Sequence, residues 1–346
     1  MPPYTTTLVE EKEIFQKNEE QECTFGREKY KFLIWEFETR IIWTNVILIG
    51  LFHFIALYSF LTHSYFEKPG IVIYATVIGS ICGFGITGGI HRYFTHRSYK
   101  AKLPLKLILI FCFSMSGQNS ILEWVRDHRV HHKFSETDAD PHDSRRGFFF
   151  AHVGWLMMKK RTEVIKKGRQ IDYSDLLEDP LVAFHERHFM WFKLICCFIL
   201  PTIIPPLAWG ESWIVSIKAL VFARYVMQLN YTWLVNSAAH IYGNKPYDIK
   251  ICPSENLAVS FVSMGEGYHN YHHTFPWDYR AAEVGSYLNV TTLVLNLFEK
   301  IGWAYDMKST PQELIRKMVE NNGDGSHYKW GHEITQDKAK VLMKEL

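Results

Sequence analysis

Two clusters of histidines with identical spacing carry the strongest chemical signal in this chain of 346 residues. HRVHH at 128–132 and HNYHH at 269–273 both place histidines at i, i+3 and i+4. On an α-helix these positions share one face, so each cluster points three imidazoles at one place. Neutral imidazole is a ligand for zinc, copper, iron and nickel. The two segments therefore predict metal-binding helices.

Three further histidines fit the same purpose. His91 and His96, in HRYFTH, are five residues apart, a spacing that does not align on a regular helix and so predicts a helix end or a distortion. His240 closes the motif NSAAH. With the two clusters they make nine candidates among 17 histidines, more than the three or four protein ligands of a single zinc site. Two sites with four or five ligands each are the economical interpretation, so we predict a dinuclear centre.

Few carboxylates interleave with these histidines, which sets the pattern apart from the carboxylate-rich di-iron helix bundles. Asp127, Asp138 and Glu266 are near in sequence but lie off the shared histidine faces. The preference of imidazole does not by itself select iron over zinc. We interpret the other histidines as surface or core residues, with His142 in DADPHDS the one most worth following.

Long apolar segments must position these ligands. A helix needs about 20 apolar residues to cross a bilayer. The stretches that reach this length are 41–61, 71–90, 189–209 and 213–235. A shorter stretch at 103–117 carries Lys106 and is predicted to lie at the interface or inside the protein. The short links at 63–70 and 209–211 pair the four spans into two hairpins.

The distribution of charge predicts the topology. The hairpin links contain only Lys68 as a lysine or arginine, whereas 91–188 is rich in both. The positive-inside tendency then places both termini and a cap formed by 91–188 and 236–310 in the cytosol, with all nine histidines on that side. We expect a partly disordered cytosolic segment at 1–40, a membrane domain at 41–310 and a cytosolic tail at 311–346.

Composition argues against several other classes of protein. The formal net charge is only +2, so no overall field favours nucleic acid. The first forty residues contain no apolar core of a signal peptide. The six cysteines show no paired-motif spacing and four of them lie in apolar runs. We therefore expect a reducing environment and no disulfide framework.

These motifs and their neighbours resemble the membrane acyl-CoA desaturases of the stearoyl-CoA desaturase type, most closely the insect, moth-like branch. The resemblance covers residues 40–304 and rests on HRYFTH at 91–96, EWVRDHRVHHKFSETDADPH at 123–142, RRGFFFAHVGW at 145–155, WLVNSAAH at 233–240 and GEGYHNYHH at 265–273. It implies an all-α integral membrane protein with four transmembrane helices in two hairpins, under a cytosolic helical cap that holds a histidine-rich di-metal site.

The resemblance also implies cofactors, partners and site residues. It implies two iron ions, O2, a fatty acyl-CoA substrate, and electrons from cytochrome b5 and its NADH-dependent reductase, in the endoplasmic reticulum membrane. The implied metal ligands are His91, His96, His128, His131, His132, His240, His269, His272 and His273, with Asn236 as a ligand through water. The implied acyl-CoA contacts are Asn45, Asn119, Arg126, Asp127, Lys159, Lys160 and Trp233. Lys159 stands where arginine is expected, which keeps the charge and loses the bidentate fork for phosphate.

The implied reaction is the O2-dependent introduction of a double bond into a saturated acyl chain. Removing hydrogen from an unactivated methylene is chemistry that a redox cofactor must supply. The apolar tail is expected in a tunnel lined by Trp124 and Trp233, with Gly79 and Gly83 at its end. Close helix packing is the alternative explanation for those glycines. A Δ9 product is the default, with Δ11 or another position open, for general lipid synthesis or for a pheromone precursor.

Two rival interpretations stay open at this point. Another membrane di-iron oxidase, such as a hydroxylase of fatty acids, alkanes or sterols, would share the clustered histidines. A histidine-rich zinc carrier or zinc-stabilised membrane protein is the alternative outside the oxidases, although transport sites usually lie near the bilayer midplane. Chain-length preference, double-bond geometry and oligomeric state do not follow from the sequence.

Overall fold

The computed structural model describes residues 30–32, 35–37, 39–283 and 288–331. The expectations for residues 1–29 and for the tail at 332–346 lie outside these described residues. The chain forms two compact units. The first comprises Met1–Ala75 and Gly117–Val226, and the second comprises Thr76–Ser116 and Met227–Leu346. The chain passes from one unit to the other at three points: within α3 (Pro69–Phe84), directly after Ser116, and within α13 (Arg224–Asn236).

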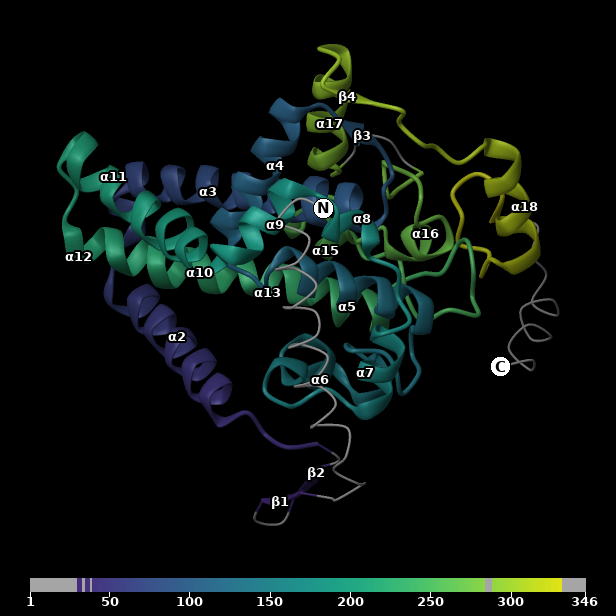
Figure 1. Ribbon diagram of the computed structural model, residues 1–346, viewed down its shortest axis with the longest axis horizontal. Coiled ribbons are helices and arrows are strands. Elements are labelled where there is room, and N and C mark those ends of the chain that lie inside the picture. Colours follow the sequence, from purple (N-terminus) through teal and green to yellow (C-terminus); the bar gives the residue numbers. More distant parts are fainter. Residues whose placement is uncertain (1–29, 33–34, 38, 284–287, 332–346) are drawn as a thin grey trace. The chain divides into compact units, whose positions relative to one another are not determined.

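The first unit is helical apart from one short hairpin (Figure 1). Its elements are β1 (Tyr30–Phe32), β2 (Trp35–Phe37), α2 (Trp43–Thr62), η1 (Tyr65–Glu67), α5 (Ile121–Phe134), η3 (Ser144–Arg146), α6 (Phe148–His152), η4 (Gly154–Leu156), α7 (Thr162–Gly168), α8 (Ser174–Leu177), α9 (Pro180–Arg187), α10 (Phe189–Phe192), η5 (Lys193–Ile199), α11 (Leu200–Trp209), α12 (Trp213–Ser216) and η6 (Ile217–Ala223). Strands β1 and β2 pair antiparallel, with Tyr30 opposite Phe37.

The second unit is also helical. Its elements are η2 (Gly85–Thr95), β3 (Lys100–Ala101), α4 (Leu103–Ser116), α14 (Ala238–Ile241), α15 (Leu257–Val262), α16 (His269–Thr274), α17 (Val290–Lys300), β4 (Ala304–Tyr305) and α18 (Gln312–Asn322). Strands β3 and β4 pair antiparallel. The prediction of a helical fold is thus confirmed for the described residues, apart from one short hairpin and one short pairing of distant strands. None of the five described cysteines forms a disulfide, and Cys23 lies outside the described residues.

Within the part of the chain that the structure describes, three helical runs are long and apolar enough to cross a membrane, namely Trp43–Thr62, Pro69–Thr95 and Phe189–Trp209. They correspond to three of the four predicted spans, the second longer than predicted because the helix continues through HRYFT. The predicted fourth span at 213–235 is helical through α12, η6 and α13, but it contains Lys218 and Arg224 and is not among these runs. A fourth is reached only if Leu103–Ser116 and Ile121–Phe134 count as one broken span. The arrangement of four spans in two hairpins therefore stays a prediction.

The surface of the first unit agrees with a lipid environment. Helix α2 exposes large apolar side chains along most of its length, including Phe54 at 67% and Leu61 at 77%. In water such a face would be an aggregation hazard, whereas in a bilayer it is the normal outer surface of a helix. The two predicted hairpin turns also meet, because Lys68 Nζ lies 2.7 Å from Glu211 Oε1.

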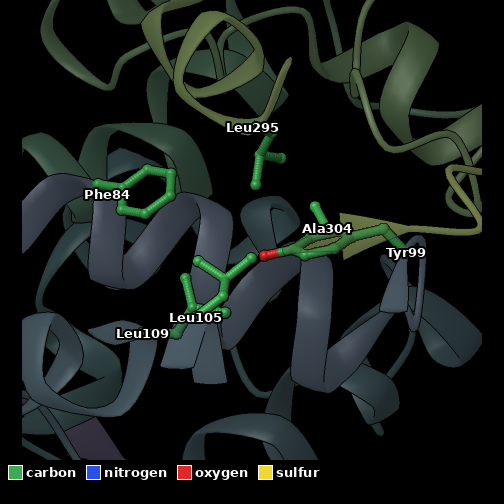
Figure 2. Close-up of a cluster of buried hydrophobic side chains, with 6 residues drawn as sticks. All are labelled: Phe84, Tyr99, Leu105, Leu109, Leu295 and Ala304. Carbon is green, nitrogen blue, oxygen red and sulfur yellow. The ribbon is translucent and has the colours of Figure 1, made fainter. Parts of the chain in front are cut away.

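A compact apolar core holds η2, which carries His91, against α4 and α17 in the second unit. Helix α4 packs along η2, and α17 packs on the same π-helix. Figure 2 shows the buried side chains that fill this contact, from α3, α4, α17, β4 and the residue before β3: Phe84, Tyr99, Leu105, Leu109, Leu295 and Ala304. The Tyr99 hydroxyl donates to the carbonyl of Gly88 at 2.7 Å, so it is satisfied inside the core. The interior position predicted for the 103–117 stretch is thus confirmed for one face of α4.

One glycine permits the closest backbone approach in this core. A Cβ atom added to Gly85, where η2 begins, would lie 2.2 Å from the carbonyl carbon of Cys112 and 2.3 Å from the amide nitrogen of Phe113. Both atoms belong to the backbone of α4, which cannot move aside as a flexible side chain does. Glycine at position 85 therefore sets the distance between α4 and η2.

A polar network fastens the last described segment to the second unit. Glu283 Oε2 accepts hydrogen bonds from His327 Nε2 at 2.7 Å and from the Tyr247 hydroxyl at 2.9 Å. Burial would raise the pKa of the Glu283 carboxyl, but the hydrogen bonds from His327 and Tyr247 outweigh burial and hold that pKa below its usual range. Tyr247 also packs against Tyr271 of α16, so this network braces the helix that carries HNYHH.

Candidate metal centre

Helix α5 carries the first histidine cluster, as the spacing predicts. Ser120 caps its start by accepting the backbone N–H of Glu123 at 3.4 Å. Arg129, on the same helix, donates two hydrogen bonds to the Asp175 carboxylate at 2.9 and 3.0 Å, which anchors α5 to α8. The helix turns His128 and His132 to one side, where their Nε2 atoms lie 3.1 Å apart.

The third histidine of this helix meets a buried aspartate. His131 Nδ1 lies 2.8 Å from Asp140 Oδ1, and both side chains are essentially inaccessible to solvent. Burial would raise the pKa of Asp140, but His131 and His142 outweigh burial and hold that pKa well below its usual range. An ionised carboxylate only accepts hydrogen bonds. Therefore Nδ1 of His131 carries a proton, and Nε2 is the ring nitrogen that can bind a metal ion.

His142 lies beside this pair. Its ring stands edge-on to Trp155, with ring centroids 4.3 Å apart, and 5.4 Å from the ring of His131. Burial and the nearby His131 lower the pKa of His142 to about 3, so it is neutral near pH 7. The ligand atoms of His131, Asp140 and His142 lie within 4.8 Å of one another. His142, which sequence reasoning left outside the ligand set, is therefore a neighbour of that set.

The second unit brings three more candidates together at the end of its long helix. Residues Gly85–Thr95 form a π-helix, and the N–H of His96 donates to the carbonyl of His91 at 3.1 Å, five residues back. The wider π-helical turn brings positions i and i+5 to one side, which confirms the predicted distortion at HRYFTH. The ligand nitrogens of His91, His96 and His272 lie within 4.8 Å of one another. Nε2 of His91 is 2.9 Å from Nε2 of His272.

The remaining three candidates form a separate group in the same unit. Helix α16 contains HNYHH, as predicted, and α14 carries His240 just after the break at Ser237. Nε2 of His269 lies 3.0 Å from that of His240 and 3.1 Å from that of His273. The i, i+4 pair on α16 thus reproduces the 3.1 Å separation of the i, i+4 pair on α5.

The geometry of these groups fits bound metal ions. The four Nε2 pairs are separated by 2.9–3.1 Å. Two nitrogen ligands at right angles around one ion, each about 2.1 Å from it, lie about 3.0 Å apart. A donor set made of imidazoles suits zinc, iron, copper or nickel. The residues present therefore fit a metal within each group, whereas a single di-metal site built from all nine histidines stays a prediction.

Glu266 approaches a candidate ligand, His91, although its position is off the histidine face. Its Oε2 lies 2.9 Å from Nδ1 of His91, and its Oε1 accepts hydrogen bonds from Arg92. Burial would raise the pKa of Glu266, but Arg92 and His91 outweigh burial and lower it to about 2. Sequence reasoning missed the roles of Glu266 and Asp140. Glu266 lies in the motif GEGYHNYHH and Asp140 in DADPH, and this membership in the motifs was the one sequence signal that pointed to them.

Several predicted acyl-CoA contacts gather in the first unit. Lys160 Nζ lies 2.6 and 2.8 Å from the two oxygens of Asp127, and Arg126 Nε lies 3.5 Å from the same carboxylate. The Asn45 side chain donates to the carbonyl of Leu156 at 2.7 Å. The backbone N–H of Lys159 bonds the carbonyl of Arg40 at 2.9 Å. Two basic side chains, Lys160 and Arg126, thus lie beside the buried carboxylate of Asp127.

The other predicted residues lie on several elements. Asn119 is in the loop before α5, and the Trp124 ring lies 4.8 Å from that of His128. Trp233 is buried on α13, which ends at Asn236. A Cβ on Gly83 would lie 2.5 Å from Met264 Sδ, whereas a Cβ on Gly79 would meet nothing within 4 Å. The two glycines therefore differ sharply in the space around them.

Comparison with known proteins identifies the family. Residues 67–283 match the fatty acid desaturase family. The chain belongs to this family. The desaturase is 51% identical over 296 residues to an acyl-CoA Delta-9 desaturase of Acheta domesticus, covering 85% of this chain and 82% of that protein. It is 44% identical over 335 residues to an acyl-CoA Delta(11) desaturase of Spodoptera littoralis, covering 95% and 94%.

A vertebrate relative shows the same likeness. The desaturase is 47% identical over 286 residues to stearoyl-CoA desaturase 5 of Bos taurus, covering 83% of this chain and 85% of that protein. The resemblance to acyl-CoA desaturases, insect proteins included, is thus confirmed. The chain is an enzyme, an oxidoreductase of lipid metabolism, so the zinc-carrier interpretation is wrong. Desaturases are membrane proteins, in agreement with the three apolar helical runs.

Proposed function

We propose that this desaturase introduces a double bond into a saturated fatty acyl-CoA at a centre of two histidine-bound iron ions, with O2 as oxidant. The proposed ligands are the nine histidines of the three motifs and NSAAH, with Asn236 acting through water. The observation that carries the proposal is the repeated 2.9–3.1 Å separation of imidazole nitrogens. It occurs in a chain 51% identical to a protein named acyl-CoA Delta-9 desaturase.

The metal ions and the protein side chains would have different roles in the proposed reaction. When bound, iron would supply the redox chemistry that takes hydrogen from an unactivated methylene. The chain supplies orientation. Asp140 holds the proton of His131 on Nδ1, which aims the Nε2 lone pair away from the carboxylate. The buried imidazoles, such as His269 and His272 at 1% exposure each, exclude water from the place where the acyl chain reacts.

The polar end of the substrate matches the basic residues of the first unit. We propose that Lys159, Lys160 and Arg126 bind the phosphates of coenzyme A, with Asn45, Asn119, Asp127 and Trp233 as further contacts. Lys160 is 25% exposed and is already oriented by the nearly buried Asp127. A lysine held in place by a carboxylate loses less rotamer freedom when a ligand arrives, which favours binding.

The topology proposal rests on charge and on one ion pair. The Lys68–Glu211 contact joins the two predicted hairpin turns, which supports their lying on the same side of the membrane. The basic segments then face the cytosol, with both termini. We propose the endoplasmic reticulum membrane as the location, and cytochrome b5 with its NADH-dependent reductase as the source of electrons.

The position of the double bond needs its own test. We propose Δ9 as the product, because the relative with that name shares 51% identity, against 44% for the Delta(11) relative. The chain should be expressed in a yeast strain that lacks its own desaturase, and the double bonds mapped by mass spectrometry. A Δ11 or Δ12 product would overturn the regiochemical proposal alone. Hydroxylated chains without unsaturation would overturn the proposed reaction and favour a hydroxylase.

Two variants connect the product to the candidate ligands. His272→Ala should abolish the double bond and lower the iron content of the purified protein, because it removes one member of a close imidazole pair. His63→Ala, a histidine near the hairpin turn and outside every ligand group, should leave both unchanged. Equal product from His272→Ala and the wild type would refute the proposed ligand set.

A further inference from the structure

Arg92 is among the largest fully buried side chains of the described residues, at 1% exposure. It lies on the π-helix directly after His91. Its Nη1 donates to the Thr292 hydroxyl at 2.9 Å and to the carbonyl of Tyr279 at 3.0 Å, and its Nη2 lies 3.3 Å from Asn289 Oδ1. A buried guanidinium with so many acceptors is rigidly oriented. Such a group is costly to bury unless its charge is matched.

The matching charge is Glu266. Arg92 donates to Glu266 Oε1 from Nη2 at 2.8 Å and from Nε at 3.1 Å. Among the described residues the buried Oε2 makes no hydrogen bond of standard geometry, and it lies 2.9 Å from Nδ1 of His91. The two oxygens of the Glu266 carboxylate thus have different neighbours: Oε1 faces Arg92 and Oε2 faces His91.

We infer that Glu266, clamped by Arg92, is a positioning residue that keeps the proton of His91 on Nδ1 and so leaves Nε2 free to bind metal. A lone pair on Nδ1 would face a carboxylate oxygen at 2.9 Å and be repelled, whereas an N–H at that place is attracted. The inference rests on the proposed function in taking His91 as a ligand. It assigns a purpose to a buried ion pair whose cost in desolvation is otherwise unexplained.

Replacing the carboxylate by an amide separates this role from plain packing. A glutamine has one oxygen and one NH2 group. In Glu266→Gln the oxygen must turn to Arg92, because two donors of a cation point there. The NH2 group then faces Nδ1 of His91 and donates to it. The proton of His91 has to sit on Nε2 instead, which removes the lone pair that metal requires.

The first unit offers a matched control with the opposite outcome. Asp140 Oδ1 receives the N–H of His131 at 2.8 Å and the backbone N–H of His142 at 2.9 Å, whereas Oδ2 receives only the backbone N–H of Glu136 at 2.9 Å. In Asp140→Asn the amide oxygen therefore stays on the His131 side, because two donors point there. The proton of His131 remains on Nδ1. Replacing a carboxylate by an amide should therefore preserve His131 as a ligand in Asp140→Asn and disable His91 as a ligand in Glu266→Gln.

The test is metal binding by the full-length purified protein, with Fe²⁺ and with redox-inert Zn²⁺ as probes. Changing an outer partner of a ligand typically costs about 10–100-fold in metal affinity. We expect Glu266→Gln to lower the affinity for one of the two metal ions by at least about 100-fold. Asp140→Asn should lower the affinity by about 10-fold or less. Equal losses in the two variants, or two tightly bound metals in Glu266→Gln, would overturn the inference.

A second variant covers the case in which Glu266→Gln does not fold. Arg92→Lys keeps a buried cation but cannot hold Oε1 with two fixed donors, so metal affinity should fall by about 10-fold. Unchanged affinity in Arg92→Lys would overturn the clamp. The outcome is also separable from the proposed function. If the wild type binds two Zn²⁺ ions but forms no double bond, the proposed reaction fails, and the comparison of variants with Zn²⁺ still decides the role of Glu266.

Discussion

Gly85→Ala is a sharp structural perturbation in the second unit. The new Cβ would lie 2.2 Å from the carbonyl carbon of Cys112 and 2.3 Å from the amide nitrogen of Phe113. Non-bonded carbon atoms pack about 3.5–4.0 Å apart, so α4 and η2 must separate by roughly 1 Å or more. Overpacking of this kind costs about 1–3 kcal/mol, and rigid backbone on both sides places this case at the upper end.

The matched control is Gly79→Ala, on the same helical run, where a Cβ meets nothing within 4 Å. That change should be neutral or stabilising by up to about 1 kcal/mol, because alanine favours the helix. Thermal unfolding in detergent should show the Gly85→Ala variant melting roughly 4 °C lower, because about 3 kcal/mol is divided by an unfolding entropy of about 0.7 kcal/mol/K for 346 residues. Because η2 carries His91, its metal content should fall as well. A Gly85→Ala protein as stable as Gly79→Ala would refute the proposed close approach.

Three further expectations concern substrate and pH. Gly83→Leu should shift the ratio of products toward shorter acyl chains roughly tenfold, as measured by fatty acid analysis in yeast. An unchanged ratio would count against a tunnel end at Gly83, and so would an equal shift in Gly79→Leu. Lys160→Met should raise the KM for acyl-CoA about tenfold with little change in kcat. Lys166→Met, at an exposed lysine, should leave the KM unchanged. Equal KM values in the two variants would exclude a contact between Lys160 and the phosphates. Glu283, whose folded pKa is lowered, stabilises the fold above its unfolded pKa of about 4.3 and loses that contribution as pH falls through the folded pKa. The melting temperature of Glu283→Gln should therefore depend less on pH in this acid range, and parallel curves would contradict the hydrogen bonds of Glu283 with His327 and Tyr247.

Local spacing made much of the metal site predictable. The i, i+3, i+4 pattern in HRVHH and HNYHH requires only a regular helix, and both segments are helical, in α5 and α16. The five-residue spacing of HRYFTH signalled a distortion, which is the π-helix η2. Such predictions succeed because the side-chain direction follows from the backbone period alone.

Membrane topology was predictable only in part. Three apolar stretches form helices long enough to span a bilayer. The stretch at 213–235 also forms a helix, yet Lys218 and Arg224 within it lower its apolar character. Helix formation and membrane insertion depend on different properties, since the first needs backbone hydrogen bonds and the second needs an apolar outer surface.

The sequence by itself determined which residue types are present, their helical periodicity and, through the motifs, the family. Only the tertiary structure decided that Asp140 meets Nδ1 of His131, and that Glu266 meets both His91 and Arg92. Glu266 and His91 are far apart in the chain, so no local period links them. Their contact results from packing of η2 against the loop before α16, where a buried charge must find a partner and a histidine must find a place for its proton.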